Sequence, residues 1–210
     1  MDPNGREIVI KGEDGSLNTY VPGQQCSSSD KMVQTVWANL NKIYDTEAGK
    51  TVIGEMTQEN SPTFTLTNES LKNDGTGRFK KDGQGGGTIY MAGHLSISGE
   101  MSHELFHGYQ EMKGQGGISI HNEVEANLFA MITTGFSTPL QPKDDPQLET
   151  DYGKSYKAFF LKRVTASNFD NYFDALKKGF IDHSRVNYNK DYSDFPTGDN
   201  NKSLLKKFFK

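Results

Sequence analysis

The stretch of sequence that decides the fold is TIYMAGHLSISGEMSHELFHGYQEM, residues Thr88–Met112. Apolar and polar side chains alternate over its first part, Thr88–Ile97, which is typical of a half-buried strand. Ser98 is the predicted N-cap, and Gly114 the predicted C′ residue, of a helix over about residues 100–113. The segment therefore predicts a strand that leads directly into a helix.

The predicted helix carries an HExxH motif over residues 103–107. Residues four apart lie on one face of a helix, so His103 and His107 can direct both imidazoles at one zinc ion. Glu104 lies between them, near enough to a metal-bound water to act as its general base. This pattern predicts hydrolysis of a peptide bond, in which Glu104 takes a proton from water and passes it to the leaving amine.

A catalytic zinc site of this kind needs a third protein ligand and one position for water. The candidates downstream are His121, Glu123 and Glu125. We predict that Asn122 caps a second helix ending at Gly135, with Glu125 completing a capping box that gives it a structural role. His121 then lies just before the helix and Glu123 in its first turn. We choose Glu123 as the third ligand, with Glu125 next and His121 last.

Two residues near the ligands have predicted supporting roles. Asn127 lies one turn beyond Glu123, where its amide oxygen can accept the ring N–H of His103. The alternative for Asn127 is a solvent-exposed helix residue. Gly108 has no side chain, so we expect it to let the Glu123 helix approach closely.

The group that stabilises the oxyanion is less well specified by the sequence. Tyr109 and His183 are the main candidates, with Tyr90 and His94 beside them, and for each of them a structural role is the simpler alternative. We also expect the strand from Tyr90 to Ile97 to pair with an extended peptide substrate through main-chain hydrogen bonds.

The two motifs together resemble a known group of enzymes. HELFH followed by Glu123-Val-Glu-Ala-Asn-Leu-Phe-Ala130 resembles the gluzincin pattern, and its second half is similar to the E-x-x-A-N-x-F-A helix of ImmA/IrrE-type metallopeptidases. The resemblance covers about 45 residues, Thr88–Ile132. It implies one Zn²⁺ per chain with Glu123 as a ligand, and a zincin-like α+β fold with a small antiparallel or mixed sheet packed on the HExxH helix.

A second resemblance lies at the N-terminus. Asp2-Pro3-Asn4-Gly5-Arg6 resembles the D-P-x-G-R boundary that closes the core of RHS-repeat proteins, although the chain carries no RHS repeats. In such proteins the segment after this boundary is a variable toxin domain, and zinc peptidases are one recurrent kind. The resemblance implies a bacterial effector that is secreted or injected as part of a larger protein, with a protein or peptide substrate and a cognate immunity protein as partners.

Composition excludes several other classes of protein. The formal net charge is −4, and no stripe of Lys and Arg interleaves with aromatic residues, so we expect no nucleic-acid partner. No apolar run is long enough for a membrane helix, and the N-terminus lacks the apolar region of a signal peptide. The single cysteine, Cys26, excludes both an internal disulfide and a zinc site built from several thiolates.

The remaining segments outline the rest of the domain. We predict an N-terminal hairpin and linker over residues 1–29 and a metallopeptidase domain over residues 30–210. The Gly-rich segment over residues 73–87 is predicted to be a lid or a hairpin tip. The other predicted elements are hairpin strands at Arg6–Lys11 and Leu17–Val21, a helix capped by Asp30 and ended by Gly49, strands at Thr51–Met56 and Pro62–Thr67, and helices at Asp151–Val164 and Asn168–Asp182.

Two other functions remain open on the sequence alone. One is a non-catalytic, zinc-stabilised module for protein interaction, in which Glu104 has no chemical role. The other is a helical interaction domain without a metal, in which His103 and His107 are ordinary core or surface residues.

Overall fold

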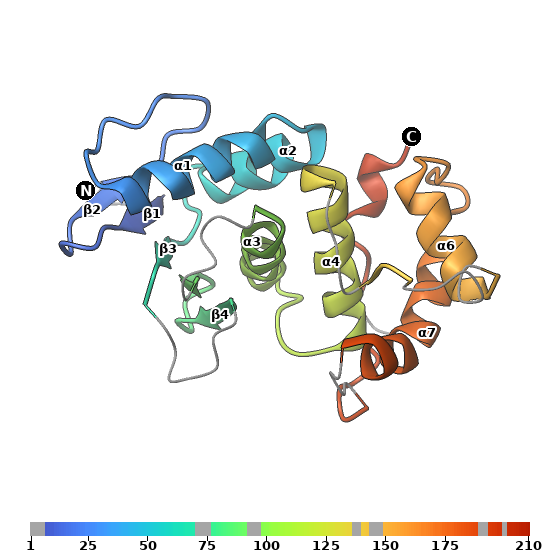
Figure 1. Ribbon diagram of the computed structural model, residues 1–210. Helices are drawn as coiled ribbons and strands as arrows, with labels where there is room; N and C mark the ends of the chain where they lie inside the picture. Colours follow the sequence, from blue (N-terminus) through green and yellow to red (C-terminus); the bar gives the residue numbers. More distant parts are fainter. Residues whose placement is uncertain are drawn as a thin grey trace. The chain divides into compact units, whose positions relative to one another are not determined.

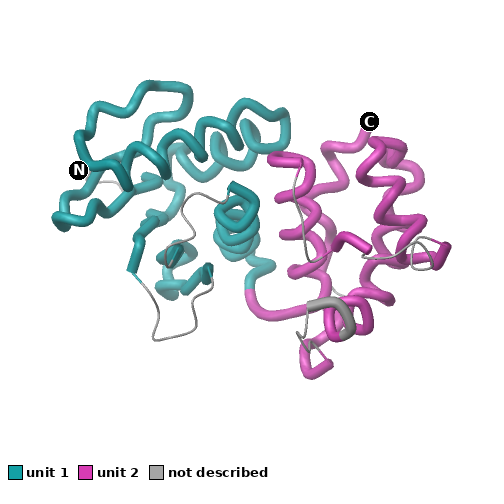
Figure 2. Tube along the Cα trace, viewed as in Figure 1, with its two compact units in different colours: residues 1–116 teal, residues 117–210 magenta. Residues whose placement is uncertain are grey.

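The computed structural model describes residues 7–69, 77–91, 98–135, 140–142, 149–188, 193–198 and 201–210 (Figure 1). The chain divides into two compact units, Met1–Gly116 and Gly117–Lys210 (Figure 2). The predicted division after residue 29 stays a prediction. The RHS-like motif Asp2–Arg6 lies outside the described residues.

The first unit contains a mixed sheet of five strands among its described residues, in the order β2-β1-β3-β5-β4. Two hairpins, β1–β2 and β4–β5, are antiparallel, whereas β1–β3 and β3–β5 are parallel. Helices accompany this sheet, so the predicted mixed α+β class is confirmed. The strands are β1 (Ile8–Lys11), β2 (Leu17–Thr19), β3 (Phe64–Thr67), β4 (Arg78–Lys81) and β5 (Gly87–Tyr90).

The predicted N-terminal hairpin is confirmed in β1 and β2. Gly15, with φ +82°, supplies the left-handed conformation of its turn. β1 also pairs in parallel with β3, so the hairpin belongs to the main sheet.

The first two helices differ from the prediction. Helix α1 (Lys31–Tyr44) begins after Asp30, whose side chain accepts the N–H groups of Met32 and Val33 as expected for an N-cap. It ends before the predicted Gly49, because Thr46 caps a new helix, α2 (Glu47–Met56).

The predicted strand Thr51–Met56 is therefore wrong. Its β-branched Thr-Val-Ile run resembles a strand, but Val52, Ile53 and Met56 are buried at helical spacing within α2. Packing of α2 against α1 outweighs the local β preference.

The Gly-rich segment contains a strand that the sequence did not indicate. β4 pairs with β5 across a turn in which the Asp82 carboxylate accepts the N–H groups of Gln84 and Gly86. The hairpin-tip prediction is confirmed for this part. Residues 70–76 lie outside the described residues, and a lid role stays a prediction.

β5 confirms only the start of the strand predicted over Thr88–Ile97, because residues 92–97 lie outside the described part. β5 lies between β3 and β4. The predicted pairing of the strand Tyr90–Ile97 with a peptide substrate stays a prediction, because most of that strand lies outside the described residues. β4 contacts the HExxH helix and lies at an edge of the sheet.

Helix α3 (Ser98–Met112) carries the HExxH motif. Leu105 and Phe106 are fully buried, as predicted. Gly114 (φ +71°) follows the helix, and the Gln115 N–H donates to the Gln110 carbonyl at 2.9 Å. This is a Schellman motif, which confirms Gly114 as the C′ residue.

Gly108 allows a close approach, but of different segments from the one predicted. A Cβ atom at this position would lie 3.1 Å from the Phe64 ring and 3.5 Å from Met56. The residues that need the space are therefore in β3 and α2. This contact fixes α3 against the sheet.

The second unit is helical in its described residues. It contains α4 (Ile120–Thr134), α6 (Asp151–Phe160), α7 (Phe169–Tyr188) and a 3₁₀ turn, Lys206–Phe208. The two helices predicted near Asp151 and Asn168 are confirmed. Aromatic rings fill much of the interior, where Phe169 contacts both Phe159 and Phe173. Within the described part of the chain, every helix is too short or too polar to cross a bilayer.

Candidate metal centre

Helix α3 presents the histidines of the motif on one face. His103 and His107 are half-buried, whereas Leu105 and Phe106 face the core. The Nε2 atoms of the two histidines lie 2.9 Å apart, and their ring centroids 4.6 Å apart. The spacing of four residues thus aims both imidazoles at one point, as the sequence predicted.

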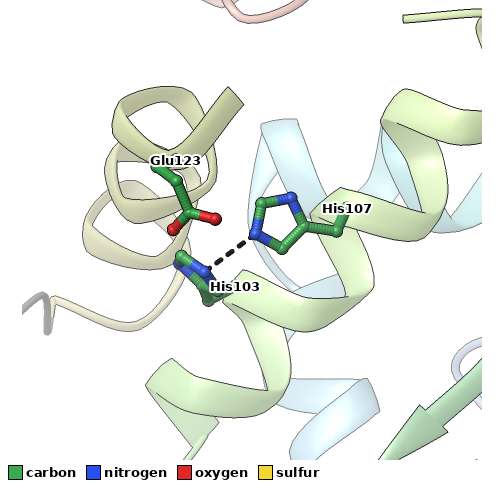
Figure 3. Close-up of side chains that lie close together, drawn as sticks. All are labelled: His103, His107 and Glu123. Atoms are coloured by element: carbon green, nitrogen blue, oxygen red, sulfur yellow. Dashed lines mark hydrogen bonds between the residues drawn. The ribbon is translucent and has the colours of Figure 1, made fainter. Parts of the chain in front are cut away.

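Glu123 of α4 completes the group. Ligand atoms of His103, His107 and Glu123 all lie within 4.8 Å of one another (Figure 3). The Glu123 carboxylate points toward the two rings (Figure 3). These three predicted ligands therefore form a group that can hold a metal ion.

The donor set fits a zinc ion in chemistry and in spacing. Two imidazole nitrogens and one carboxylate oxygen are a ligand set found in catalytic zinc sites. Tetrahedral ligation at the usual Zn–N distance puts two nitrogens about 3.4 Å apart. From the observed 2.9 Å, the two rings need to separate by only about half an ångström.

Gln110 orients His107, a role that was missed in the sequence. Its side chain is buried, and its Oε1 lies 2.9 Å from Nδ1 of His107. An amide oxygen only accepts, so this contact favours the tautomer with the proton on Nδ1, in which Nε2 keeps its lone pair for a metal. The spacing of three residues on one helix was a signal that could have identified this pair.

The start of α4 corrects the argument used to choose Glu123. The N-cap is Ser119, whose Oγ accepts the N–H of Asn122 at 3.1 Å. Asn122 is thus inside the helix, and the predicted capping box with Glu125 is wrong. Ser119 was overlooked because no Glu or Gln stands three residues after it to mark a capping box.

The two alternative ligands have other partners in the second unit. Glu125 is buried, and its Oε1 accepts hydrogen bonds from Ser203 Oγ and from the N–H of Leu205. His121 is also buried, with its ring 5.0 Å from that of Phe173. Glu125 has the structural role predicted for it, with a different partner. His121 lies within the helix rather than before it.

Asn127 is buried, so the alternative of a solvent-exposed residue is wrong. Its Nδ2 donates to the backbone carbonyl of Glu123 at 2.8 Å. That bond stabilises the turn of α4 that carries the third member of the group. The predicted hydrogen bond from His103 to the Asn127 amide oxygen stays a prediction.

Glu104 contacts the edge strand of the sheet. Its Oε2 accepts the backbone N–H of Phe79 at 2.7 Å. Gly77, just before β4, lies against the Glu104 side chain. Sequence reasoning missed this arrangement because it did not recognise β4.

The candidate oxyanion donors have contacts of other kinds. Tyr109 is fully buried and donates its O–H to Glu55 at 2.7 Å, where Lys113 also forms an ion pair. His183 is buried and stacks on Tyr152 with ring centroids 4.6 Å apart. These contacts favour structural roles for Tyr109 and His183, and their role as oxyanion donors stays a prediction.

The other two candidate oxyanion donors are Tyr90 and His94, and their role also stays a prediction. Tyr90 is half-buried at the end of β5, and His94 lies outside the described residues.

No protein-family model, curated protein or solved structure matches the chain. The resemblances to gluzincins, to ImmA/IrrE-type metallopeptidases and to RHS-repeat proteins therefore depend on their short motifs. The site must be interpreted from its own residues, which offer two imidazoles and a carboxylate to one metal ion.

Proposed function

We propose that this chain is a zinc-dependent metalloendopeptidase with a zincin-like catalytic core. The observation that carries the proposal is the group formed by His103, His107 and Glu123, whose ligand atoms lie within 4.8 Å of one another. Glu104 follows His103 directly, which puts a carboxylate beside the metal ligands. Three protein ligands leave a fourth tetrahedral position for water, as catalytic zinc sites require.

In this proposal each residue has one task. A zinc ion held by the three ligands would polarise a water and lower its pKa toward neutrality. Glu104 takes the proton from that water and delivers it to the leaving amine. Gln110 keeps the Nδ1 proton on His107, so that Nε2 is the ligand atom.

The edge strand β4 supports a peptide as the substrate. It is an outer strand of the sheet, and it contacts α3 beside Glu104. An extended peptide can add to such an edge through main-chain hydrogen bonds to groups other than the Phe79 N–H, which donates to Glu104. The edge strand β4 is thus a candidate for substrate binding beside the predicted strand Tyr90–Ile97.

We also propose that the enzyme acts as a bacterial effector or toxin domain with a cognate immunity protein. This part depends on the RHS-like motif Asp2–Arg6. Export of a larger parent protein, by secretion or injection, belongs to the same proposal.

The test combines metal content with cleavage by the full chain. We expect about one zinc per chain and hydrolysis of a peptide library. Glu104→Gln should retain zinc and lose activity by at least about 100-fold, since the amide cannot accept the proton. Glu111→Gln is the matched control, because Glu111 lies on the same helix and contacts Lys81 instead.

The outcomes separate the alternatives. Stoichiometric zinc with no cleavage by the unmodified chain would refute the peptidase and favour the zinc-stabilised interaction module. If the chain binds no zinc and zinc leaves its melting temperature unchanged, the metal-free helical domain is favoured. The reason is that an ion that binds only the native state would raise the melting temperature.

A further inference from the structure

We infer that the start of β4 positions the general base, with the Phe79 N–H holding one oxygen of Glu104 and Gly77 providing the space. This inference rests on the proposed function, because the orientation of Glu104 affects a rate only if the chain hydrolyses peptides. Phe79 and Gly77 are positioning residues in this account, since they act through Glu104.

The pairing of the strands shows why this amide is available. The Met91 N–H donates to the Thr67 carbonyl, so by alternation the N–H of Ile89 also faces β3. Ile89 is paired with Phe79 in the antiparallel ladder. The pair is therefore non-hydrogen-bonded, and the main-chain groups of Phe79 face the outer edge of β4.

Glu104 accepts this outward-facing amide. The distance from Phe79 N to Glu104 Oε2 is 2.7 Å, which is short for an N–H···O bond and typical of a bond to a carboxylate. Anchoring Oε2 limits rotation of the carboxylate and leaves Oε1 to take a proton. A base fixed in this way loses little freedom when the reaction occurs.

Gly77 provides the space that this contact requires. A Cβ atom there would lie 3.2 Å from Cγ of Glu104 and 3.7 Å from its Oε1. The first distance is tighter than ordinary van der Waals contact, so any side chain would displace Glu104 by a few tenths of an ångström. Gly77 does not have positive φ, so space rather than backbone conformation explains the glycine.

The hydrogen bond itself can be tested without any activity. In the zinc-loaded, ¹⁵N-labelled full chain, Glu104→Ala should move the Phe79 amide proton upfield and speed its exchange by about tenfold or more. Glu111→Ala is the matched control, since it removes another carboxylate of α3 that contacts β4 through Lys81. A Phe79 amide that responds no more to Glu104→Ala than to this control would overturn the inference.

The effect on catalysis is tested by Gly77→Ala against Gly54→Ala. A Cβ atom at Gly54, in α2, would meet nothing within 4 Å. We expect Gly77→Ala to lower kcat by about tenfold, because small displacements of a catalytic group cost large factors in rate. KM and zinc affinity should stay within about twofold of the parent, since the added Cβ atom meets Glu104 and none of the three ligands.

Each outcome of these experiments has a defined meaning. An unchanged kcat in Gly77→Ala would overturn the inference, and so would a parallel loss of zinc, which would show that the helix moved rather than the carboxylate. If the unmodified chain cleaves no peptide, the proposed function fails. The amide experiment then still decides whether β4 holds Glu104.

Discussion

Gln110 is the residue whose substitution tests the metal centre most directly. We predict that Gln110→Met weakens zinc binding, because Met has a similar volume but cannot accept the Nδ1–H of His107 in the same way. Gln110→Glu keeps an acceptor at this position, and a carboxylate is a common partner of a zinc-bound histidine. The two variants therefore separate the hydrogen bond from the packing of a buried side chain.

The magnitude follows from the geometry of the pair. The 2.9 Å hydrogen bond favours the His107 tautomer whose Nε2 can bind the metal. It also limits rotation of the His107 ring, because Nδ1 is held toward Gln110. Loss of such a partner lowers metal affinity by about 10- to 100-fold. This corresponds to about 1.4 to 2.8 kcal/mol of binding free energy.

The assay is competition for zinc with a chromophoric chelator, supported by ¹⁵N shifts of the His107 ring. Gln110→Met should show the weaker affinity and a mixture of His107 tautomers before zinc is added. Gln110→Glu should stay within about threefold of the parent. Parental zinc affinity in Gln110→Met, with the chain folded, would refute the assignment of Gln110 as the residue that orients His107.

Two further predictions concern stability. Ser119→Ala should lower the free energy of unfolding, measured by urea titration, by about 1 kcal/mol, because it removes the N-cap of α4. Ser119→Gly should lower the same free energy by only about a few tenths of a kcal/mol. Equal losses in the two variants would contradict the assignment of the cap. Burial of Tyr20 raises the pKa of its hydroxyl, which donates to Asn41 at 2.8 Å. Because the unfolded chain loses this proton first, the contribution of Tyr20 to stability is present below its ordinary pKa of about 10 and declines as the pH rises above it. In Tyr20→Phe, the free energy of unfolding measured by urea titration should fall less steeply as the pH rises above about 10. The same slope in Tyr20→Phe and the parent would contradict this account.

The face of α3 that carries the two histidines could be predicted because its signals are local. Residues 103–107 specify the spacing of the two histidines, and the buried Leu105 and Phe106 define the opposite face. Gly114 ends the helix through its own backbone conformation. Each of these properties depends on neighbours within one or two turns, so no knowledge of the rest of the fold is needed.

The errors occurred where distant segments decide the structure. Thr51–Met56 has β-branched residues but is helical, because α2 packs on α1. β4 consists of three basic residues and Phe79, and pairing with β5 makes it a strand. Local preference was too weak in both cases to indicate the packing.

The candidate site shows the same division. The sequence by itself determined the relative directions of His103, Glu104 and His107, since a helix of 3.6 residues per turn fixes them. Only the tertiary structure decided that Phe79 holds Glu104 and that Glu125 is bound by Ser203 rather than by its own helix end. Glu123 was chosen with a capping argument that the structure overturned, and yet it joins the metal group. Such contacts connect residues far apart in the chain, and they form only when burial brings those residues together.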